Sequence, residues 1–240
     1  MTSVFLSDVH LYPADKIHPG REPFLKFLFE LSGQEPGELW ILGDLFDYWF
    51  EYSGLIPAGY ERILHLLRDL SDRGWKTAFL PGNHDWWCGK NLENATGMRV
   101  IRDSPLWVSI QGHNCVLAHG DGLGKGDLGY RLIKPILRSP LSIRLFSMVH
   151  PVFSTWFAQA FSGTSRRVLR QQTDSVPGFL SDWAESMGRK GADLVITGHT
   201  HCPVVQKLPG VMHASLGDWI SHFTYLTIRG GEIQLNEFEM

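Results

Sequence analysis

The sequence predicts an α/β fold in which two mixed sheets pack together and helices cover their outer faces. Two observations support this prediction. In the first third of the chain, short apolar runs of strand length alternate with longer runs that have the helical period. After residue 99, short β-like runs separated by turn residues dominate as far as the C-terminus. A single domain of 240 residues can bury a full core, so we expect one domain over residues 1–240.

The first part of the chain is expected to form a βαβαβ unit. Its elements are, in order, a strand at 3–6, a helix at 23–31, a strand at 39–42, a helix at 58–73 and a strand at 77–80. Within the second helix, Ile63, Leu67 and Leu70 recur at the helical period, and Gly74 follows as a stop signal. This order favours parallel strands joined by helices.

The rest of the chain is expected to supply the other strands. Two paired strands flank a turn-like break at 111–114, and Gly230-Gly231 marks another turn. The expected strands lie at 106–110, 115–118, 193–197, 204–208, 211–214, 223–228 and 233–238. Together with the first three strands, they suffice for two packed sheets.

Residues 123–190 are expected to form a helical, lid-like insertion. They lie between two predicted strands that each lead into a histidine, and they are rich in apolar residues such as Trp156 and Phe157. Basic residues such as Arg138 and Arg144 accompany the apolar ones. An apolar stripe at helical spacing is usually core, but mixed apolar and basic helices also lie at membrane interfaces. We favour a lid or a lipid pocket over ordinary core.

Composition limits the class of protein. The formal net charge is -3, whereas a duplex-binding protein usually carries a basic excess, so we expect no nucleic-acid partner. The three cysteines, Cys88, Cys115 and Cys202, show no paired spacing, which favours a reducing, cytoplasmic compartment. No signal peptide is expected after Met1. The most apolar stretch, 143–161, is interrupted by charge and proline, which argues against a membrane span.

Five short clusters of Asp, Asn and His follow apolar runs. They are Asp8-Val9-His10, Gly43-Asp44, Gly82-Asn83-His84-Asp85, His119-Gly120-Asp121 and Gly198-His199-Thr200-His201. In an open α/β sheet, the ends of neighbouring strands converge on one crevice, where ligands bind. Residues two apart in an extended segment, such as Asp8 and His10, point to the same face. We therefore expect the clusters to meet in space.

These residue types match a metal site. Carboxylate and amide oxygens combined with neutral imidazole, and without thiolate, suit Mn²⁺, Fe²⁺, Co²⁺ or Zn²⁺. Seven ligands suit two ions with one shared carboxylate, and Asp44 is the expected bridge because it is the lone carboxylate of its cluster. Glycines beside the ligands allow the backbone to turn sharply. Any single cluster has a simpler explanation as a turn, a cap or a core histidine; the ordered series of five favours a metal centre.

The ordered series resembles the calcineurin-like metallophosphoesterase superfamily, and its motifs extend over residues 8–201. The resemblance implies a four-layer αββα sandwich and two divalent ions, for which we expect Mn²⁺, with Fe, Co and Zn as alternatives. The two implied ligand sets share Asp44 and are Asp8, His10, Asp44 and His201 for one ion, and Asp44, Asn83, His119 and His199 for the other.

A narrower resemblance is to the UDP-2,3-diacylglucosamine diphosphatases of lipid A biosynthesis. The segments 7–11, 43–49, 119–123 and 127–130 carry it. It implies cleavage of the diphosphate bond of UDP-2,3-diacylglucosamine to UMP and 2,3-diacylglucosamine 1-phosphate, with the insertion covering the acyl chains. Many members of that family have Arg where this chain has His84. This departure does not affect the two-metal chemistry, but it bears on which substrate the enzyme cleaves.

The expected catalytic residues are His84, Asn83 and Asp44. His84 is expected to contact a phosphate oxygen or to protonate the leaving group. Asp85 is expected either to orient a metal-bound imidazole or to cap a helix that begins at Trp86.

The expected substrate contacts lie in the insertion. Arg166, Arg167 and Arg170 are expected to meet the diphosphate; the alternative is a solvated basic face. By resemblance, Asp127 and Tyr130 are expected to meet the head group of a nucleotide-lipid substrate, although on a helix they could also cap and pack. Such a substrate implies peripheral contact with the cytoplasmic side of the inner membrane. The sequence leaves the oligomeric state open.

Two other functions are compatible with the motifs. One is a metallophosphoesterase that acts on another nucleotide or phosphodiester substrate. The other is a non-catalytic scaffold on the same fold. The scaffold is disfavoured because scaffolds lose ligands, whereas this chain keeps all seven.

Overall fold

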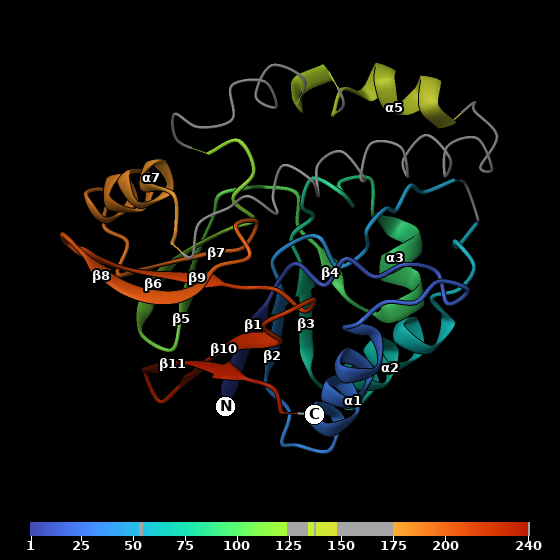
Figure 1. The fold of residues 1–240 in the computed structure, drawn as a ribbon, viewed down its shortest axis with the longest axis horizontal. Helices are drawn as coiled ribbons and strands as arrows, with labels where there is room; N and C mark the ends of the chain where they lie inside the picture. The colour runs from blue at the N-terminus through green and yellow to red at the C-terminus, as the bar shows by residue number, and fades with distance from the viewer. Residues whose placement is uncertain (53–54, 124–133, 137, 148–174, 240) are drawn as a thin grey trace.

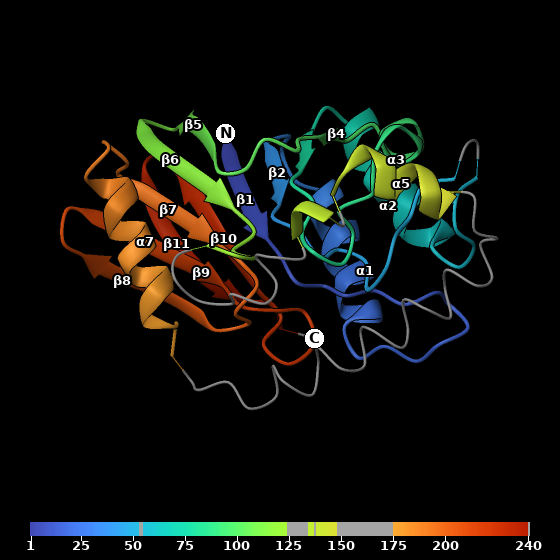
Figure 2. The ribbon, with the colours of Figure 1, turned by 90° about the horizontal axis from the view of Figure 1, so that it is seen from above.

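Two β-sheets face each other at the centre of the computed structural model, which describes residues 1–52, 55–123, 134–136, 138–147 and 175–239. Figures 1 and 2 show four layers in succession: α7, the smaller sheet, the larger sheet, and the helices α1, α2 and α3. The predicted α/β fold and its αββα layering are therefore confirmed.

The larger sheet has six strands in the order β11-β10-β1-β2-β3-β4. Its strands are β1 (Thr2–Leu6), β2 (Glu38–Ile41), β3 (Lys76–Phe79), β4 (Arg99–Val100), β10 (Thr224–Arg229) and β11 (Glu232–Glu237). The first four are parallel, as the predicted βαβαβ order requires, whereas β10 and β11 form an antiparallel hairpin on the edge beside β1.

The smaller sheet has five strands in the order β5-β6-β7-β9-β8. They are β5 (Leu106–Ile110), β6 (His113–Ala118), β7 (Leu194–Thr197), β8 (Pro203–Leu208) and β9 (Val211–Leu216). The break predicted at 111–114 is shorter than expected. Gln111 and Gly112 both have positive φ, 46° and 89°, which closes a two-residue hairpin and lets β6 begin at His113.

Three helices cover the outer face of the larger sheet: α1 (Arg21–Ser32), α2 (Glu61–Asp72) and α3 (Lys90–Thr96). α2 begins at Glu61 rather than at 58, because Gly59 has a φ of 90° and donates its N–H to the Glu61 carboxylate. α3 was not predicted. Its N-terminus is capped by the distant Glu51, whose carboxylate accepts the N–H groups of Gly89, Asn91 and Leu92.

The outer layer on the smaller sheet is α7 (Gly178–Gly188), which contacts β7, β8 and β9. Leu180, Ala184 and Met187 are buried, and two of them pack with Val195 of β7 in one apolar cluster. The last part of the expected insertion, 123–190, thus forms the helical layer that covers the smaller sheet. The other boundary of the insertion remains a prediction.

The contact between the sheets is a separate apolar layer. Phe5, Leu42, Leu117 and Ile196 all have no exposed surface there. Removing apolar side chains from water is the main stabilising contribution in such a layer, at about 25 cal/mol per Å². This layer fixes the two sheets against each other, and so fixes the relative positions of the loops at their ends.

α5 (Pro140–Ser147) is the described part of the insertion that lies apart from both sheets. Figure 1 shows it at the end of the molecule toward which β1 runs. Leu141 and Leu145, one turn apart on this helix, are 67% and 58% exposed. None of the helices in the described ranges has the length and hydropathy that crossing a bilayer requires.

Leu117→Ala tests the layer between the sheets. We expect it to lower the free energy of unfolding by about 2–5 kcal/mol, because it removes a fully buried side chain and leaves a cavity. Leu145→Ala is the matched control and should change that free energy by less than about 0.5 kcal/mol. Urea denaturation of the metal-free proteins measures both, and equal effects would contradict the assignment.

Candidate metal centre

The first two clusters lie on neighbouring loops beyond the ends of β1 and β2. The Asp8 N–H donates to the Gly43 carbonyl oxygen over 3.1 Å, and the His10 N–H donates to the Asp44 carbonyl oxygen over 2.8 Å. The parallel pairing of the strands therefore continues past their ends. It brings the Asp8, His10 and Asp44 side chains to one edge of the sheet, as the sequence predicted.

An unusual backbone conformation is shared by most of the expected ligands. The residues with positive φ among them are Asp8 (56°), His10 (51°), Asp44 (52°), His199 (69°) and His201 (57°). The left-handed region is uncommon for residues other than glycine and costs free energy. Its concentration at one place is typical of a functional site, where surrounding structure holds the chain in a conformation that it would otherwise avoid.

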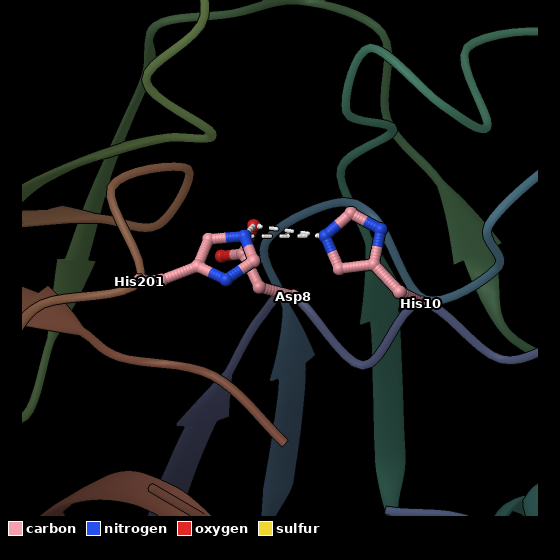
Figure 3. Close-up of side chains that lie close together, drawn as sticks. All are labelled: Asp8, His10 and His201. Carbon is pink, nitrogen blue, oxygen red and sulfur yellow. Dashed lines mark hydrogen bonds and ion pairs between the residues drawn. The ribbon is translucent and has the colours of Figure 1, made fainter. Parts of the chain in front are cut away.

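Asp8, His10 and His201 form one group of possible metal ligands, and their nearest ligand atoms all lie within 4.8 Å of one another. Figure 3 shows the two imidazoles on either side of the Asp8 carboxylate. His10 Nε2 and His201 Nε2 are 3.3 Å apart, and His201 Nε2 is 3.4 Å from Asp8 Oδ1. This oxygen is buried and accepts no hydrogen bond from the described residues.

Asp44, His119 and His199 form a second group within the same limit. The Leu42 carbonyl oxygen, 2.8 Å from His119 Nδ1, can only accept a hydrogen bond, so Nδ1 carries a hydrogen. This leaves His119 Nε2 facing Asp44 Oδ2 at 3.3 Å and Asn83 Oδ1 at 3.1 Å. Nitrogen and oxygen atoms that hold lone pairs thus converge on one point.

Asp44 joins the two groups. Its Oδ2 lies 3.3 Å from His119 Nε2 and 3.7 Å from His10 Nε2. All seven expected ligands are therefore gathered by the fold, six in these two groups and Asn83 through its contact with His119. The donor set fits divalent cations, because lone pairs that face one another in a buried place are stable only with a positive charge between them.

Two of the four ligand imidazoles, His119 and His201, have a raised proton affinity, whereas burial lowers the pKa of His10, and that of His199 to about 4. Burial alone would lower the pKa of His119, but the Asp44 carboxylate opposes it and raises that pKa to about 10. Burial likewise lowers the pKa of His201, and Asp8 and Asp218 together raise it to about 10. Burial would raise the pKa of Asp44, yet the neighbouring imidazoles hold it well below its usual range. In a protein without metal, protons therefore occupy positions that cations could take.

His84 lies beside Asp44 at the edge of the site. Its Nδ1 donates to the Asp47 carbonyl oxygen over 2.8 Å, and its Nε2 is 4.0 Å from Asp44 Oδ2. Its ring meets that of His10 edge-on, with the ring centres 4.8 Å apart. Burial lowers the pKa of His84, but Asp44 and Asp47 raise it more, so the net shift is upward. His84 is thus suited to carry a proton.

Asp85 plays neither of the two roles expected from the sequence. Its Oδ1 accepts the N–H groups of Gly82 and Asp44, over 2.9 and 3.2 Å, and its Oδ2 accepts the N–H of Phe46 over 3.2 Å. Trp86 does not begin a helix. Asp85 instead ties the loop that carries Asn83 to the loop that carries Asp44, because loops without strand pairing need other partners for their amides.

Some glycines of the clusters allow a sharp turn of the backbone, and others allow a carboxylate to pack against their α-carbon. Gly43 has a φ of 87°, as expected for a sharp turn. Gly82 and Gly198 do not have positive φ, yet a Cβ on Gly82 would lie 2.1 Å from Asp44 Oδ1, and one on Gly198 would lie 2.5 Å from Asp8 Oδ2. Both glycines therefore leave room for a carboxylate ligand.

Asp121 ties Lys134 and Arg138 to the loop that follows His119. Its carboxylate is buried and lies 2.8 Å from both Lys134 Nζ and Arg138 Nη2, and the Arg138 guanidinium lies over the Trp86 ring, 3.5 Å from its centre. Trp86 follows the Gly82–Asp85 cluster directly. The five substrate-binding residues predicted in the insertion lie outside the described residues, and they are Asp127, Tyr130, Arg166, Arg167 and Arg170.

One residue that the sequence reasoning did not select also lies at the site. Asp218, in the loop after β9, has its Oδ2 3.3 Å from His201 Nδ1. A signal for it exists, because Gly217-Asp218 follows an apolar strand just as Gly43-Asp44 does.

Comparison with known proteins identifies this arrangement. The family model described as calcineurin-like phosphoesterase matches residues 1–203. The chain belongs to this family. It is a metal-dependent phosphoesterase, as its ordered motifs predicted.

Full-length relatives share the family and carry one name. A protein of Stenotrophomonas maltophilia named UDP-2,3-diacylglucosamine hydrolase is 31% identical, over 96% of this chain and 96% of that protein. A protein of the same name from Porphyromonas gingivalis is 30% identical, over 98% of this chain and 97% of its own length. Among solved structures, a novel archaeal phosphodiesterase matches with a TM-score of 0.49 and 14% identity, over 99% of both chains.

Gly198→Ala tests whether the missing side chain of Gly198 leaves room for the Asp8 carboxylate. The added methyl would lie 2.4 Å from Ser7 Oγ and 2.5 Å from Asp8 Oδ2, so the Asp8 carboxylate must move. We expect about a 5- to 150-fold loss of metal affinity, which corresponds to a displacement cost of about 1–3 kcal/mol. Gly178→Ala is the control, because no atom lies within 4 Å of its added Cβ. Calorimetric titration with Mn²⁺ measures both; wild-type affinity for Gly198→Ala would refute the argument.

Proposed function

We propose that this enzyme hydrolyses the diphosphate bond of UDP-2,3-diacylglucosamine and releases UMP and 2,3-diacylglucosamine 1-phosphate. The observation that carries the proposal is the full-length similarity, at 30–31% identity, to proteins named UDP-2,3-diacylglucosamine hydrolase. The convergence of all seven expected ligands, on loops that follow strands of both sheets, supports it, because a relative that had lost the activity would be free to lose ligands.

The proposed cofactor is a pair of divalent ions, with Mn²⁺ the first candidate. One ion would be held by Asp8, His10 and His201. The other ion would be held by Asn83, His119 and His199. Asp44 would bind both ions. A pair of ions in such a site generates a nucleophile from water near neutral pH and stabilises charge on the phosphoryl oxygens. Imidazole and carboxylate ligands without thiolate are compatible with Mn²⁺.

The chain's own residues have three tasks in this reaction. Asp44 holds the two halves of the centre at a fixed separation, because one carboxylate reaches both groups. Asn83 is fixed beside His119 by the contact between its Oδ1 and His119 Nε2. His84 lies with Nε2 4.0 Å from Asp44 Oδ2, and the upward shift of its pKa favours the protonated form, from which it would donate a hydrogen bond to a phosphate oxygen or protonate the leaving group.

The insertion is proposed to cover the acyl chains. α5 lies at the same end of the molecule as the metal ligands and exposes Leu141 and Leu145, which supports an apolar contact with substrate or with the membrane surface. Arg166, Arg167 and Arg170 are proposed to meet the diphosphate, and Asp127 and Tyr130 the head group. Binding a lipid substrate would bring the enzyme to the cytoplasmic face of the inner membrane.

Asp44→Asn tests the centre itself. The neutral amide removes the charge shared by both ligand groups, so we expect at least about a hundredfold loss of phosphodiester hydrolysis and a loss of bound metal. Asp72→Asn, on the exposed face of α2, should leave both unchanged. Metal analysis and hydrolysis of bis(p-nitrophenyl) phosphate measure the two effects. Full activity of Asp44→Asn in chelator-treated buffer would rule out the proposed chemistry.

A substrate comparison tests the lipid assignment. Wild-type enzyme should cleave UDP-2,3-diacylglucosamine far better than bis(p-nitrophenyl) phosphate or cyclic nucleotides. The double change Leu141→Ser and Leu145→Ser should raise KM for the diacylated substrate about tenfold or more, since each apolar contact contributes about 1.5–3 kcal/mol when fully buried. The same variant should hydrolyse bis(p-nitrophenyl) phosphate normally.

Trp107→Ser, which also removes a partly exposed apolar side chain, is the matched control and should change neither activity. Preference for a soluble nucleotide or a simple phosphodiester would favour the second enzymatic function instead.

A further inference from the structure

Asp218 occupies a buried position beside the metal ligands without being one of the expected ligands. It follows β9, which ends at Leu216, and it is 2% exposed. β9 lies next to β7 in the smaller sheet, and the loop after β7 carries His199 and His201. The two loops therefore leave the same edge of the sheet side by side.

One oxygen of Asp218 is occupied by its own loop. Its Oδ1 accepts the N–H groups of Ile220, Ser221 and His222, over 2.9, 2.7 and 3.1 Å. A carboxylate that accepts several backbone amides is held in one orientation and stays ionised. The other oxygen, Oδ2, accepts none of these backbone amides; it lies 3.2 Å from both Ser221 Oγ and His222 Nδ1, side-chain atoms of the same turn.

Oδ2 faces the imidazole of His201. It lies 3.3 Å from His201 Nδ1, while Nε2 at the opposite side of the ring lies 3.4 Å from Asp8 Oδ1 and 3.3 Å from His10 Nε2. A carboxylate at Nδ1 fixes the hydrogen on that nitrogen, leaves the lone pair on Nε2, and fixes the ring plane. His201 needs such a partner because its side chain is 24% exposed and its backbone has a φ of 57°.

We propose that Asp218 is the positioning residue of His201: it holds the hydrogen on Nδ1 so that Nε2 presents its lone pair beside Asp8 and His10. The proposal rests on the two-ion centre proposed above and is independent of the lipid substrate. Oδ2 also lies 3.2 Å from His222 Nδ1, so two imidazoles share this oxygen. The His222 side chain is 45% exposed, and of the two imidazoles only His201 belongs to the expected ligand groups.

Asp218→Asn separates positioning from a simple structural role. The amide oxygen can still accept the backbone N–H groups of the turn, whereas the amide NH₂ would donate to His201 Nδ1 and move the ring hydrogen to Nε2. We expect about 10- to 100-fold weaker binding of one of two Mn²⁺ ions and unchanged binding of the other. His222→Ala is the control and should bind both ions like the wild type.

Two measurements give the answer. Calorimetric titration of the metal-free proteins with Mn²⁺ reports affinity and stoichiometry, and ¹⁵N chemical shifts of the His201 ring, assigned by comparison with His201→Gln, report which nitrogen carries the hydrogen. If Asp218→Asn binds both ions with wild-type affinity, the positioning role of Asp218 is wrong, but the proposed two-ion centre is unaffected. A wild type that binds fewer than two ions overturns the proposed centre itself.

A double-mutant cycle covers the case in which Asp218→Asn also lowers stability. If Asp218 acts through His201, adding Asp218→Asn to His201→Gln will not weaken Mn²⁺ binding further. If the two effects multiply, Asp218 acts through the fold of its loop and the positioning role is excluded.

Discussion

Convergence of lone pairs at the carboxyl ends of the strands is the constraint on which this molecule depends. Imidazole nitrogens and carboxylate oxygens lie 3.3–3.7 Å apart in a region almost closed to water. Such an arrangement costs free energy unless positive charge enters it. The upward shifts of the pKa of His119 and His201 show that these two positions attract a proton strongly in the absence of metal.

Contacts elsewhere in the fold offset the free energy that this convergence of lone pairs costs. The apolar layer between the sheets holds strands from both halves of the chain in register. Asp85 then joins two ligand loops through their amides, and glycines leave room where a Cβ would collide with a carboxylate. Five ligand residues remain in the left-handed backbone region, a strain that the surrounding contacts must offset.

Sequence reasoning could predict much of this because its signals are local. Strand ends at Leu6 and Ile41 were marked by apolar runs followed by Asp8 and Asp44. The parts it missed depend on partners that are distant in sequence. α3 is capped by Glu51, Asp85 binds amides near Asp44, and Asp218 meets His201 only after β7 and β9 pair. Periodicity and spacing do not show which distant residues meet, although the Gly217-Asp218 pair after an apolar run marks Asp218 itself as a candidate.

The connection between β6 and β7 has a consequence for how enzymes of this kind diversify. These strands are parallel neighbours, so a crossover between them is obligatory, and among the described residues α7 forms part of it on the outer face of the smaller sheet. The crossover leaves β6 at Ala118, directly before the expected ligand His119. If this crossover contacts the substrate as proposed, a change within it would alter substrate preference while both sheets and the ligand loops stay the same.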